Sequence, residues 1–457
     1  MKTRKEKDSV GELSIPEDAY YGVQTQRGHN NFQISGRRMD STFIKNITLI
    51  KKAAAKVNGE CGYISERIAK AICTACDEVL EGKFDAHFIT DAIQGGAGTS
   101  VNMNVNEVIA NRATELLGGK KGEYLCHPND HVNMAQSTND VIPTAGKLTT
   151  LDLAAALLES LDKLIVALNQ KSVEFDDVIK MGRTQLQDAV PIRLGQEFKA
   201  YADALKRDHA RIKNTLREMY VVNLGGTAIG TSLNAKADYL KNIVPTLSLE
   251  CGYPLEQAED LIDSTQNVDC FVAVSAVLKA CAVNLSKMSN DLRLMSSGPK
   301  TGLGEITLPA KQNGSSIMPG KVNPVIPEVV SQVAFLVIGN DMTVSMAAEG
   351  GQLELNAFEP IIFYKLFESL TCLTNAIKTL TVNCVEGIEA NRKRCEELLH
   401  SSVGVVTALC PYIGYKKAAE IAKEALKRDM KVKDLVLWYG LMEREELERI
   451  LDPYEMT

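Results

Sequence analysis

The sequence lacks several features that would assign it to a common class of protein. No stretch approaches the roughly 20 apolar residues that span a bilayer, so we expect no membrane partner. Acidic residues outnumber basic ones, 58 to 51, and no basic block is present, which disfavours nucleic acid as a partner. Residues 1–22 have no apolar core of a secretory signal. These absences predict a soluble, cytoplasmic chain.

Histidines are few, and the cysteines form no recognisable framework. Among 6 His, the nearest pair, His127 and His131, has Pro128 between its members rather than sharing one helix face. The 11 Cys are scattered and odd in number, which favours free thiols. Cys73 and Cys76 lie in an apolar helical pattern, where thiols pack as small hydrophobic groups. We therefore expect neither a zinc site nor another resident metal.

The positions of the 14 prolines organise the rest of the chain. Four long segments without proline carry apolar residues at helical spacing: 144–190, 192–244, 255–298 and 361–410. In one of them, Phe271, Val274 and Leu278 fall on one helix face. Strand-like alternation is scarce, and aromatic residues make up 5% of the chain. This pattern predicts an all-α fold built on a bundle of long antiparallel helices.

A chain of 457 residues fits about three domains of roughly 150 residues each. Glycine and proline concentrate at the ends of the long helical segments rather than in a low-complexity linker. We predict a mainly helical amino-terminal domain over 1–140, a central long-helix domain over 141–395, and a small helical carboxy-terminal domain over 396–457.

Four polar segments beside the helical patterns are candidates for a binding site. They are rich in hydroxyls, amides and glycine, and they cover 98–106, 137–140, 182–188 and 314–324. Such donors, together with Lys321, suit the oxygens of a small, multiply charged anion. One such segment alone is typical of turns and helix caps. Four of them beside long helices favour a binding site.

The segment 314–324 does not fit a nucleotide site. Five residues separate Gly314 from Gly320 where a P-loop has four, and Val322 stands in place of the magnesium-binding Ser or Thr. The glycine-rich segment 223–230 does not match the dinucleotide fingerprint either. With so few histidines, no convincing Ser-His-Asp triad can be built. A serine near backbone amides and a cation then favours proton abstraction beside a bound dicarboxylate.

The segment 314–324, Gly-Ser-Ser-Ile-Met-Pro-Gly-Lys-Val-Asn-Pro, resembles the signature loop of the aspartase/fumarase superfamily. Segments 98–104 and 127–140 resemble two further parts of that family's active site. The resemblance runs from 19–26 to 451–457 and so covers almost the whole chain. Members of the family eliminate fumarate from succinyl compounds, and the resemblance implies the same reaction class here.

Within the superfamily, the Tyr20-Tyr21 opening and the segment 181–191 are most similar to the members that deaminate L-aspartate. Fumarases and another aspartate-deaminating branch have histidine where this chain has Gln185, so no histidine role is transferred. Glu328 matches the carboxylate that supports this acid/base histidine in relatives. Ammonia leaves as an already protonated amine and needs a general acid less than hydroxide does, which favours loss of ammonia over loss of water.

The resemblance implies that Ser315 is the general base that takes the Cβ proton of L-aspartate and forms an aci-carboxylate intermediate. Backbone amides and Lys321 would lower the pKa of its hydroxyl. The implied substrate-binding residues are Thr184, Lys321 and Asn323 at the α-carboxylate, Thr99, Ser100, Ser137, Thr138 and Ser316 at the β-carboxylate, and Asn139 with Gln185 at the amino group. Donors to the β-carboxylate must strengthen their bonds in the transition state.

The resemblance also implies a homotetramer with a 20-helix core, in which each active site draws on three subunits. No cofactor is required, and activation by Mg²⁺ is left open. His127, Asn129 and Asp130 resemble a secondary dicarboxylate site of fumarases, but we favour a purely structural role for this loop. Three alternative functions stay open: a class II fumarate hydratase acting on L-malate, a lyase for a larger succinyl compound, and a non-catalytic helical scaffold.

Overall fold

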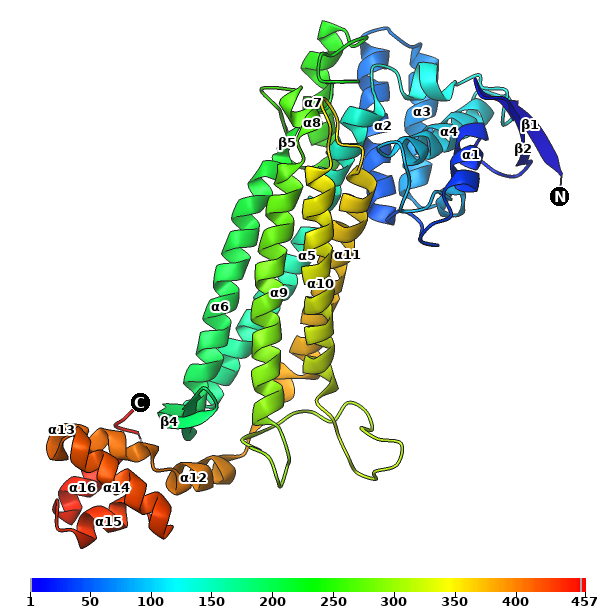
Figure 1. Ribbon diagram of the computed structural model, residues 1–457. Helices are drawn as coiled ribbons and strands as arrows, with labels where there is room; N and C mark the ends of the chain where they lie inside the picture. Colours follow the sequence, from blue (N-terminus) through cyan, green and yellow to red (C-terminus); the bar gives the residue numbers. More distant parts are fainter. Residues whose placement is uncertain (1, 453) are drawn as a thin grey trace. The chain divides into compact units, whose positions relative to one another are not determined.

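The computed structural model describes residues 2–452 and 454–457 (Figure 1). The chain forms two compact units, each assembled from three stretches of sequence. Unit 1 comprises Met1–Leu158, Arg211–Lys279 and Leu336–Cys372, and unit 2 comprises Glu159–Ala210, Ala280–Phe335 and Leu373–Thr457. The predicted three-domain division, with boundaries near 140 and 395, stays a prediction.

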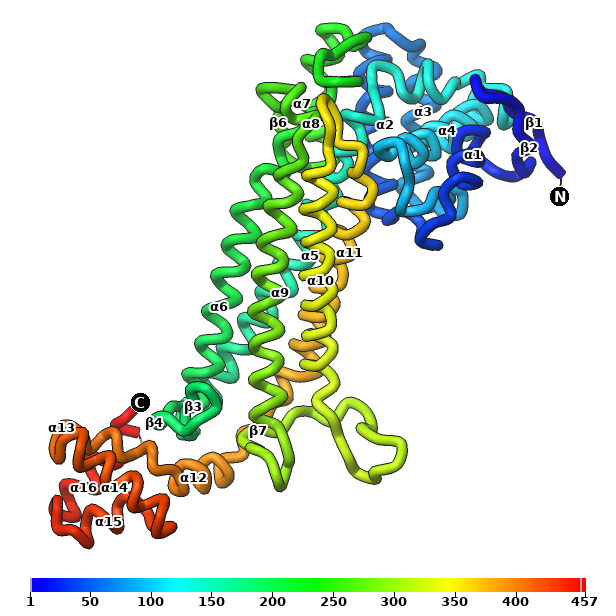
Figure 2. Tube along the Cα trace, in the orientation of Figure 1, coloured from blue at the N-terminus to red at the C-terminus, as the bar shows by residue number. Residues whose placement is uncertain are grey.

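Five long helices each contribute one part to unit 1 and another to unit 2. They are α5 (Thr138–Glu174), α6 (Leu194–Thr215), α9 (Asp269–Met295), α10 (Val325–Glu349) and α11 (Glu359–Asn383). Within each unit these helical segments run side by side (Figures 1 and 2). The apolar period of α9 explains why, since Phe271, Val274 and Leu278 are at most 1% exposed. The predicted all-α, long-helix fold is confirmed.

Unit 1 adds shorter elements around α2. They are β1 (Thr3–Lys7), β2 (Glu12–Pro16), α1 (Val23–Asn31), α2 (Ser41–Glu60), α3 (Glu66–Leu80), α4 (Thr99–Leu116), β5 (Val221–Val222), α7 (Ala237–Cys251), β6 (Glu256–Gln257) and α8 (Asp263–Gln266). Helix α2 packs against α3, α4 and α7. Its first turn is capped by Asp40, whose carboxylate accepts the Thr42 N–H at 2.8 Å. Ile47 and Ile50 are fully buried on the apolar face of α2.

Unit 2 adds two short antiparallel sheets and the carboxy-terminal helices. Its elements are β3 (Ile179–Thr184), β4 (Gln187–Arg193), β7 (Ile306–Thr307), β8 (Glu389–Ala390), α12 (Arg392–Ser401), α13 (Cys410–Ile413), α14 (Tyr415–Arg428), α15 (Val432–Trp438) and α16 (Arg444–Ile450). Strand β3 pairs with β4, and β7 pairs with β8. Helices α14 to α16 share a core of their own that includes Ile421, Leu435 and Leu447.

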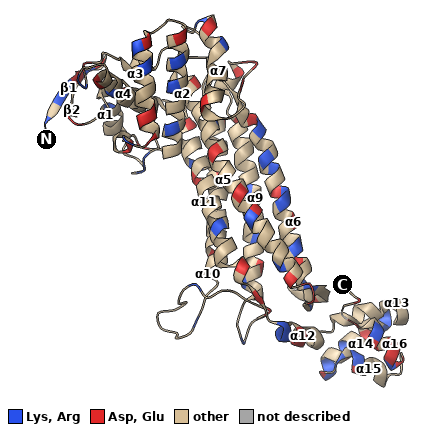
Figure 3. Cartoon of the chain, turned by 180° about the vertical axis from the view of Figure 1, so that it is seen from behind, with Lys and Arg blue, Asp and Glu red and all other residues tan. Residues whose placement is uncertain are grey.

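Charged residues are frequent along α6 (Figure 3), whereas α10 has none between Glu328 and Asp341. By length and hydropathy alone, α9 and α10 are apolar enough to cross a membrane, which qualifies the expectation that no stretch is. This is weak evidence, because the core helices of a bundle pass the same test.

Candidate active site

The residues predicted to bind substrate fall into two groups, one on each unit. Thr99, Ser100, Ser137, Thr138 and Asn139 belong to unit 1, and Thr184, Gln185, Ser315, Ser316, Lys321 and Asn323 belong to unit 2. Within each group the structure brings together segments that are far apart in the sequence.

In unit 1, the first turn of α4 lies against the first turns of α5. Gly98 has a φ of +89°, and a Cβ on it would lie 3.0 Å from Cγ2 of Ile142, so glycine permits this close approach. The Nδ2 of Asn102 donates to Oγ1 of Thr138 at 3.3 Å, which links the two segments. Thr99 and Ser100 begin α4, and a helix N-terminus favours an anion such as a carboxylate.

The turn that opens α5 is held by reciprocal capping. The Oδ1 of Asp140 accepts the Ser137 N–H at 2.9 Å, and the Asn139 N–H donates to Ser137 Oγ at 3.3 Å. Asp140 is fully buried, and burial raises the pKa of its carboxyl to about 6. Ser137, Thr138 and Asn139 are half-buried beside it. Three candidate substrate-binding side chains therefore stand on one rigid turn.

A buried polar network adjoins this turn and was missed from the sequence. Lys51 of α2 is fully buried, and its Nζ donates to Oδ1 of Asn133 at 2.7 Å and to Oε1 of Gln136 at 3.0 Å. Burial lowers the pKa of Lys51 to about 7. The burial of Lys51 could have been predicted from its position, four residues after Ile47, on the apolar face of α2.

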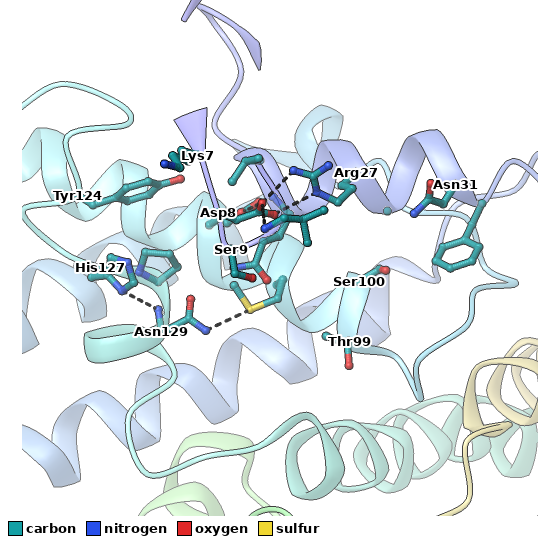
Figure 4. Close-up of a pocket in the computed structure, with 18 residues that line it drawn as sticks. Lys7, Asp8, Ser9, Arg27, Asn31, Thr99, Ser100, Tyr124, His127 and Asn129 are labelled. Atoms are coloured by element: carbon teal, nitrogen blue, oxygen red, sulfur yellow. Dashed lines mark hydrogen bonds and ion pairs between the residues drawn. The ribbon is translucent and has the colours of Figure 1, made fainter. Parts of the chain in front are cut away.

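A hollow of about 610 Å³ in unit 1 reaches Thr99 and Ser100 (Figure 4). Its opposite wall includes Asp8, whose carboxylate accepts hydrogen bonds from Nε and Nη2 of Arg27 at 3.1 and 2.8 Å. His127 also lines this hollow, but its Nδ1 accepts the N–H groups of Asn129 and Asp130, at 3.3 and 3.2 Å. These bonds give His127 a capping role in its loop.

In unit 2, the β3–β4 hairpin presents Thr184 and Gln185 at its tip. Thr184 ends β3, and Gln185 and Leu186 form the turn with φ values of +53° and +64°. Next to the tip, the hairpin is fastened by Glu305, whose Oε1 accepts from Arg183 Nη1 at 2.7 Å. Both tip residues are exposed, and Gln185 borders a hollow of about 410 Å³ that Glu305 also lines. The role of Glu305 was not predicted.

The loop 314–323 of unit 2 is closed by its own hydrogen bonds. The Gly314 N–H donates to the Lys321 carbonyl at 2.7 Å, and Nδ2 of Asn323 donates to the Gly314 carbonyl at 2.8 Å. Inside the loop, Oγ of Ser315 accepts the N–H groups of Ile317 and Met318, at 3.2 and 3.0 Å. Donors aimed at a hydroxyl oxygen favour its ionised form.

The remaining predicted residues of unit 2 lie near Ser315 in the chain and face solvent. Ser316 and Lys321 are exposed, and no described residue forms an ion pair or hydrogen bond with the Lys321 side chain. Glu328 is half-buried in the first turn of α10. Among the residues that the structure describes, no cluster of three or more His, Cys, Asp or Glu side chains is arranged to hold a metal ion.

Comparison with known proteins decides the family. Residues 11–339 match a lyase family, and residues 405–457 match the fumarase C carboxy-terminal family. An aspartate ammonia-lyase of Bacillus subtilis is 53% identical over 99% of this chain and 96% of the relative. That of Escherichia coli is 49% identical over 98% of this chain and 94% of the relative. The chain belongs to the aspartase/fumarase family of lyases.

Solved structures of this lyase family agree with the fold along the whole chain. A fumarate lyase:delta crystallin from Brucella melitensis, bound to cobalt, is 50% identical with a TM-score of 0.96, and the match covers 100% of this chain and 99% of the other. A class II fumarase from Schistosoma mansoni is 37% identical, with the same TM-score and the same coverage. The resemblance to the superfamily is confirmed.

Proposed function

We propose that this lyase deaminates L-aspartate reversibly to fumarate and ammonia. Sequence identity of about half to aspartate ammonia-lyases, over nearly the full length of both chains, supports this substrate. The structural observation that best supports the mechanism is the pair of backbone N–H groups that donate to Ser315 Oγ. A hydroxyl without a histidine partner needs such donors to act as a base.

Ser315 is the general base in this proposal. Its ionised oxygen takes a proton from Cβ of L-aspartate, and the electron pair moves onto the β-carboxylate to give the aci-carboxylate. That electron pair then forms the C=C bond as the Cα–N bond breaks on the opposite face and ammonia departs. The Lys321 ammonium favours both the Ser315 alkoxide and the bound α-carboxylate.

Three subsites hold the substrate in this proposal. Thr184, Lys321 and Asn323 bind the α-carboxylate, Thr99, Ser100, Ser137, Thr138 and Ser316 bind the β-carboxylate, and Asn139 with Gln185 faces the amino group. The β-carboxylate donors carry the largest catalytic effect, because the second negative charge develops there. The first turn of α4 and the capped turn of α5 supply most of these donors.

We further propose a homotetramer in which each site takes residues from three subunits. Two observations support it: the predicted residues divide between two units, and α10 exposes Phe335, Met342 and Met346 on one face, each more than 60% exposed. Mixing inactive Ser315→Ala and Thr138→Val chains under subunit exchange tests the sharing. Partial recovery of activity is expected, because some mixed sites contain neither substitution. No recovery would mean that each site is built by one subunit.

We propose a cytoplasmic location and a reaction without a required cofactor. Among the described residues, all 11 Cys are free thiols, which fits a reducing compartment. Activity that survives dialysis against EDTA is the expected result, and adding MgCl₂ back to the dialysed enzyme tests activation. Loss of activity restored by a metal would contradict the proposal.

The deciding assay follows fumarate by its ultraviolet absorbance, with L-aspartate and L-malate offered separately. Fumarate from aspartate with matching release of ammonia supports the proposal, and fumarate from malate alone would make the enzyme a hydratase. If neither L-aspartate nor L-malate yields fumarate, the remaining alternatives are a larger succinyl substrate or a non-catalytic role. Ser315→Ala should keep the parent circular dichroism spectrum and lose nearly all turnover. More than about a tenth of the parent rate would remove Ser315 from the role of base.

A further inference from the structure

The glycine-rich turn Asn223–Ala228 has no role in the function proposed above, yet it contacts the residue placed at the amino group. Nδ2 of Asn139 donates to the Ala228 carbonyl at 2.7 Å. Nδ2 of Asn223 donates in return to the Asn139 carbonyl at 3.0 Å. That carbonyl lies four residues before Pro143, which has no N–H to give it within α5, so the turn supplies the missing donor.

Asp140 fastens the same turn to the start of α5. Its Oδ2 accepts the N–H groups of Gly225 and Thr227, at 3.1 and 3.0 Å, while its Oδ1 accepts the Ser137 N–H. Thr227 has a φ of +56°, an unfavourable conformation for a β-branched residue that the surrounding bonds must hold. The turn and residues 137–140 therefore form one rigid body inside unit 1.

This arrangement fixes which end of the Asn139 amide faces outward. A side-chain amide has a donating NH₂ end and an accepting carbonyl end. Because Nδ2 is bound to the Ala228 carbonyl, Oδ1 is the end that is left, and no described group donates to it. A carbonyl oxygen accepts hydrogen bonds from an ammonium group but has none to give to a carboxylate.

We propose that the Asn223–Ala228 turn is a nitrogen-selecting positioning element: its Ala228 carbonyl orients Asn139 so that Oδ1 receives the ammonium group of the substrate. This inference rests on the proposed function and deepens it. Asp140 and the turn are positioning residues, since they act through Asn139. In the amination direction, Oδ1 of Asn139 accepts a hydrogen bond from the incoming nitrogen. Other groups bind the two carboxylates of fumarate.

Gly225→Ala tests the inference by disturbing the turn. Gly225 has a φ of +98°, which alanine rarely adopts, and an added Cβ would lie 2.9 Å from Leu240 Cδ2 and 3.0 Å from Gln257 Nε2. The Gln257 side chain must then shift, which disturbs its hydrogen bond to the Leu224 carbonyl of the turn. Gly252→Ala is the matched control, because its φ of +76° carries a similar backbone penalty while nothing lies within 4 Å of the new Cβ. Both variants are assayed as the full enzyme in the amination direction, where ammonium and fumarate are varied separately.

The expected result is a rise of about tenfold in KM for ammonium in Gly225→Ala, the size of one charge-assisted hydrogen bond. KM for fumarate should rise by a clearly smaller factor, because only Ser137 and Thr138 of its carboxylate donors stand on the same rigid body, and Gly252→Ala should change neither constant. Equal rises for ammonium and fumarate, or a lower unfolding temperature with unchanged constants, would overturn the inference. If Gly225→Ala does not fold, Gly226→Ala, with its Cβ 3.0 Å from the Asn223 carbonyl, gives the same comparison. A parent enzyme that forms no fumarate from aspartate would instead refute the proposed function itself.

Discussion

Replacing Glu305 with glutamine removes one charge from a buried cluster in unit 2. The Glu305 side chain is 0% exposed, and its two oxygens lie 2.7 Å from Arg183 Nη1 and 2.9 Å from Lys180 Nζ. Lys180 is 4% exposed and also lies 3.0 Å from Oε1 of Glu197. Two positive and two negative charges therefore balance in the parent. In Glu305→Gln, Lys180 keeps Glu197, and Arg183 loses the one carboxylate with which the described part of the chain pairs it.

The size of the effect follows from which charge loses its partner. Breaking a buried ion pair on one side costs about 3–5 kcal/mol, because the remaining charge stays desolvated. Arg183 is 16% exposed and Lys180 keeps Glu197, which places the loss near the lower end, about 3 kcal/mol. At about 2–4 °C per kcal/mol for a unit of this size, the unfolding midpoint should fall by about 6–12 °C.

Thermal unfolding followed by circular dichroism measures this loss. Glu159→Gln is the control, because it makes the same chemical change at an exposed i,i+4 pair with Lys163 and should leave the midpoint unchanged. Since Glu305 fastens the hairpin that presents Thr184 and Gln185, kcat/KM should also fall by about tenfold well below the midpoint. Equal midpoints for the two variants would refute the reasoning.

Three further substitutions test other parts of the chain. Burial raises the pKa of Glu107 from 4.5 to about 7, so the folded state keeps a proton that the unfolded state releases. Stability should therefore fall by up to about 3 kcal/mol as pH rises through that window, and Glu107→Gln should remove this slope from urea-unfolding midpoints. Thr138→Val should lower kcat by about 10²–10³ with an unchanged fold, and near-parent turnover would remove Thr138 from the β-carboxylate subsite. Gly314→Ala brings a Cβ to 2.6 Å from the Lys321 carbonyl and should cost most of kcat. Gly320→Ala meets no atom within 4 Å and bears only the backbone penalty of its φ of +78°, so it should cost much less, and equal rates would show that the contact between Gly314 and Lys321 is unimportant.

The long helices could be predicted because burial on one face imposes an apolar period that the sequence displays, as Phe271, Val274 and Leu278 illustrate. The positions of prolines predicted the ends of helices less reliably than the apolar period predicted the helices themselves. Helix α5 starts before Pro143, and α7 passes through Pro245. At Pro143 the explanation is tertiary, since Asn223 donates to the carbonyl that the proline leaves without an N–H partner.

The sequence predicted the candidate site only where the site consists of small polar residues in a recognisable order. The β3–β4 hairpin was not predicted, because its turn places Gln185 and Leu186 at positive φ without the glycine or asparagine that usually marks such a turn. The positioning carboxylates were missed for another reason. Gly225 and Thr227, which donate to Asp140, lie 85 and 87 residues from it along the chain, and Arg183 lies 122 residues from Glu305. No local sequence pattern predicts contacts over such separations.

The two groups of candidate residues are held in different ways, and the difference suits their proposed tasks. The β-carboxylate donors of unit 1 stand on the capped first turns of α4 and α5, beside a network that includes the fully buried Lys51 and Asp140. Such a foundation keeps the donors aimed at the charge as it develops, without reorganisation. Ser315 instead sits in a loop whose described hydrogen bonds close on the loop itself, from Gly314 to Asn323. We expect a loop of this kind to move as one body, so that the two N–H groups that support the base travel with it. On this expectation, closure over the substrate would remove solvent from around Ser315 and keep the hydrogen bonds to its oxygen.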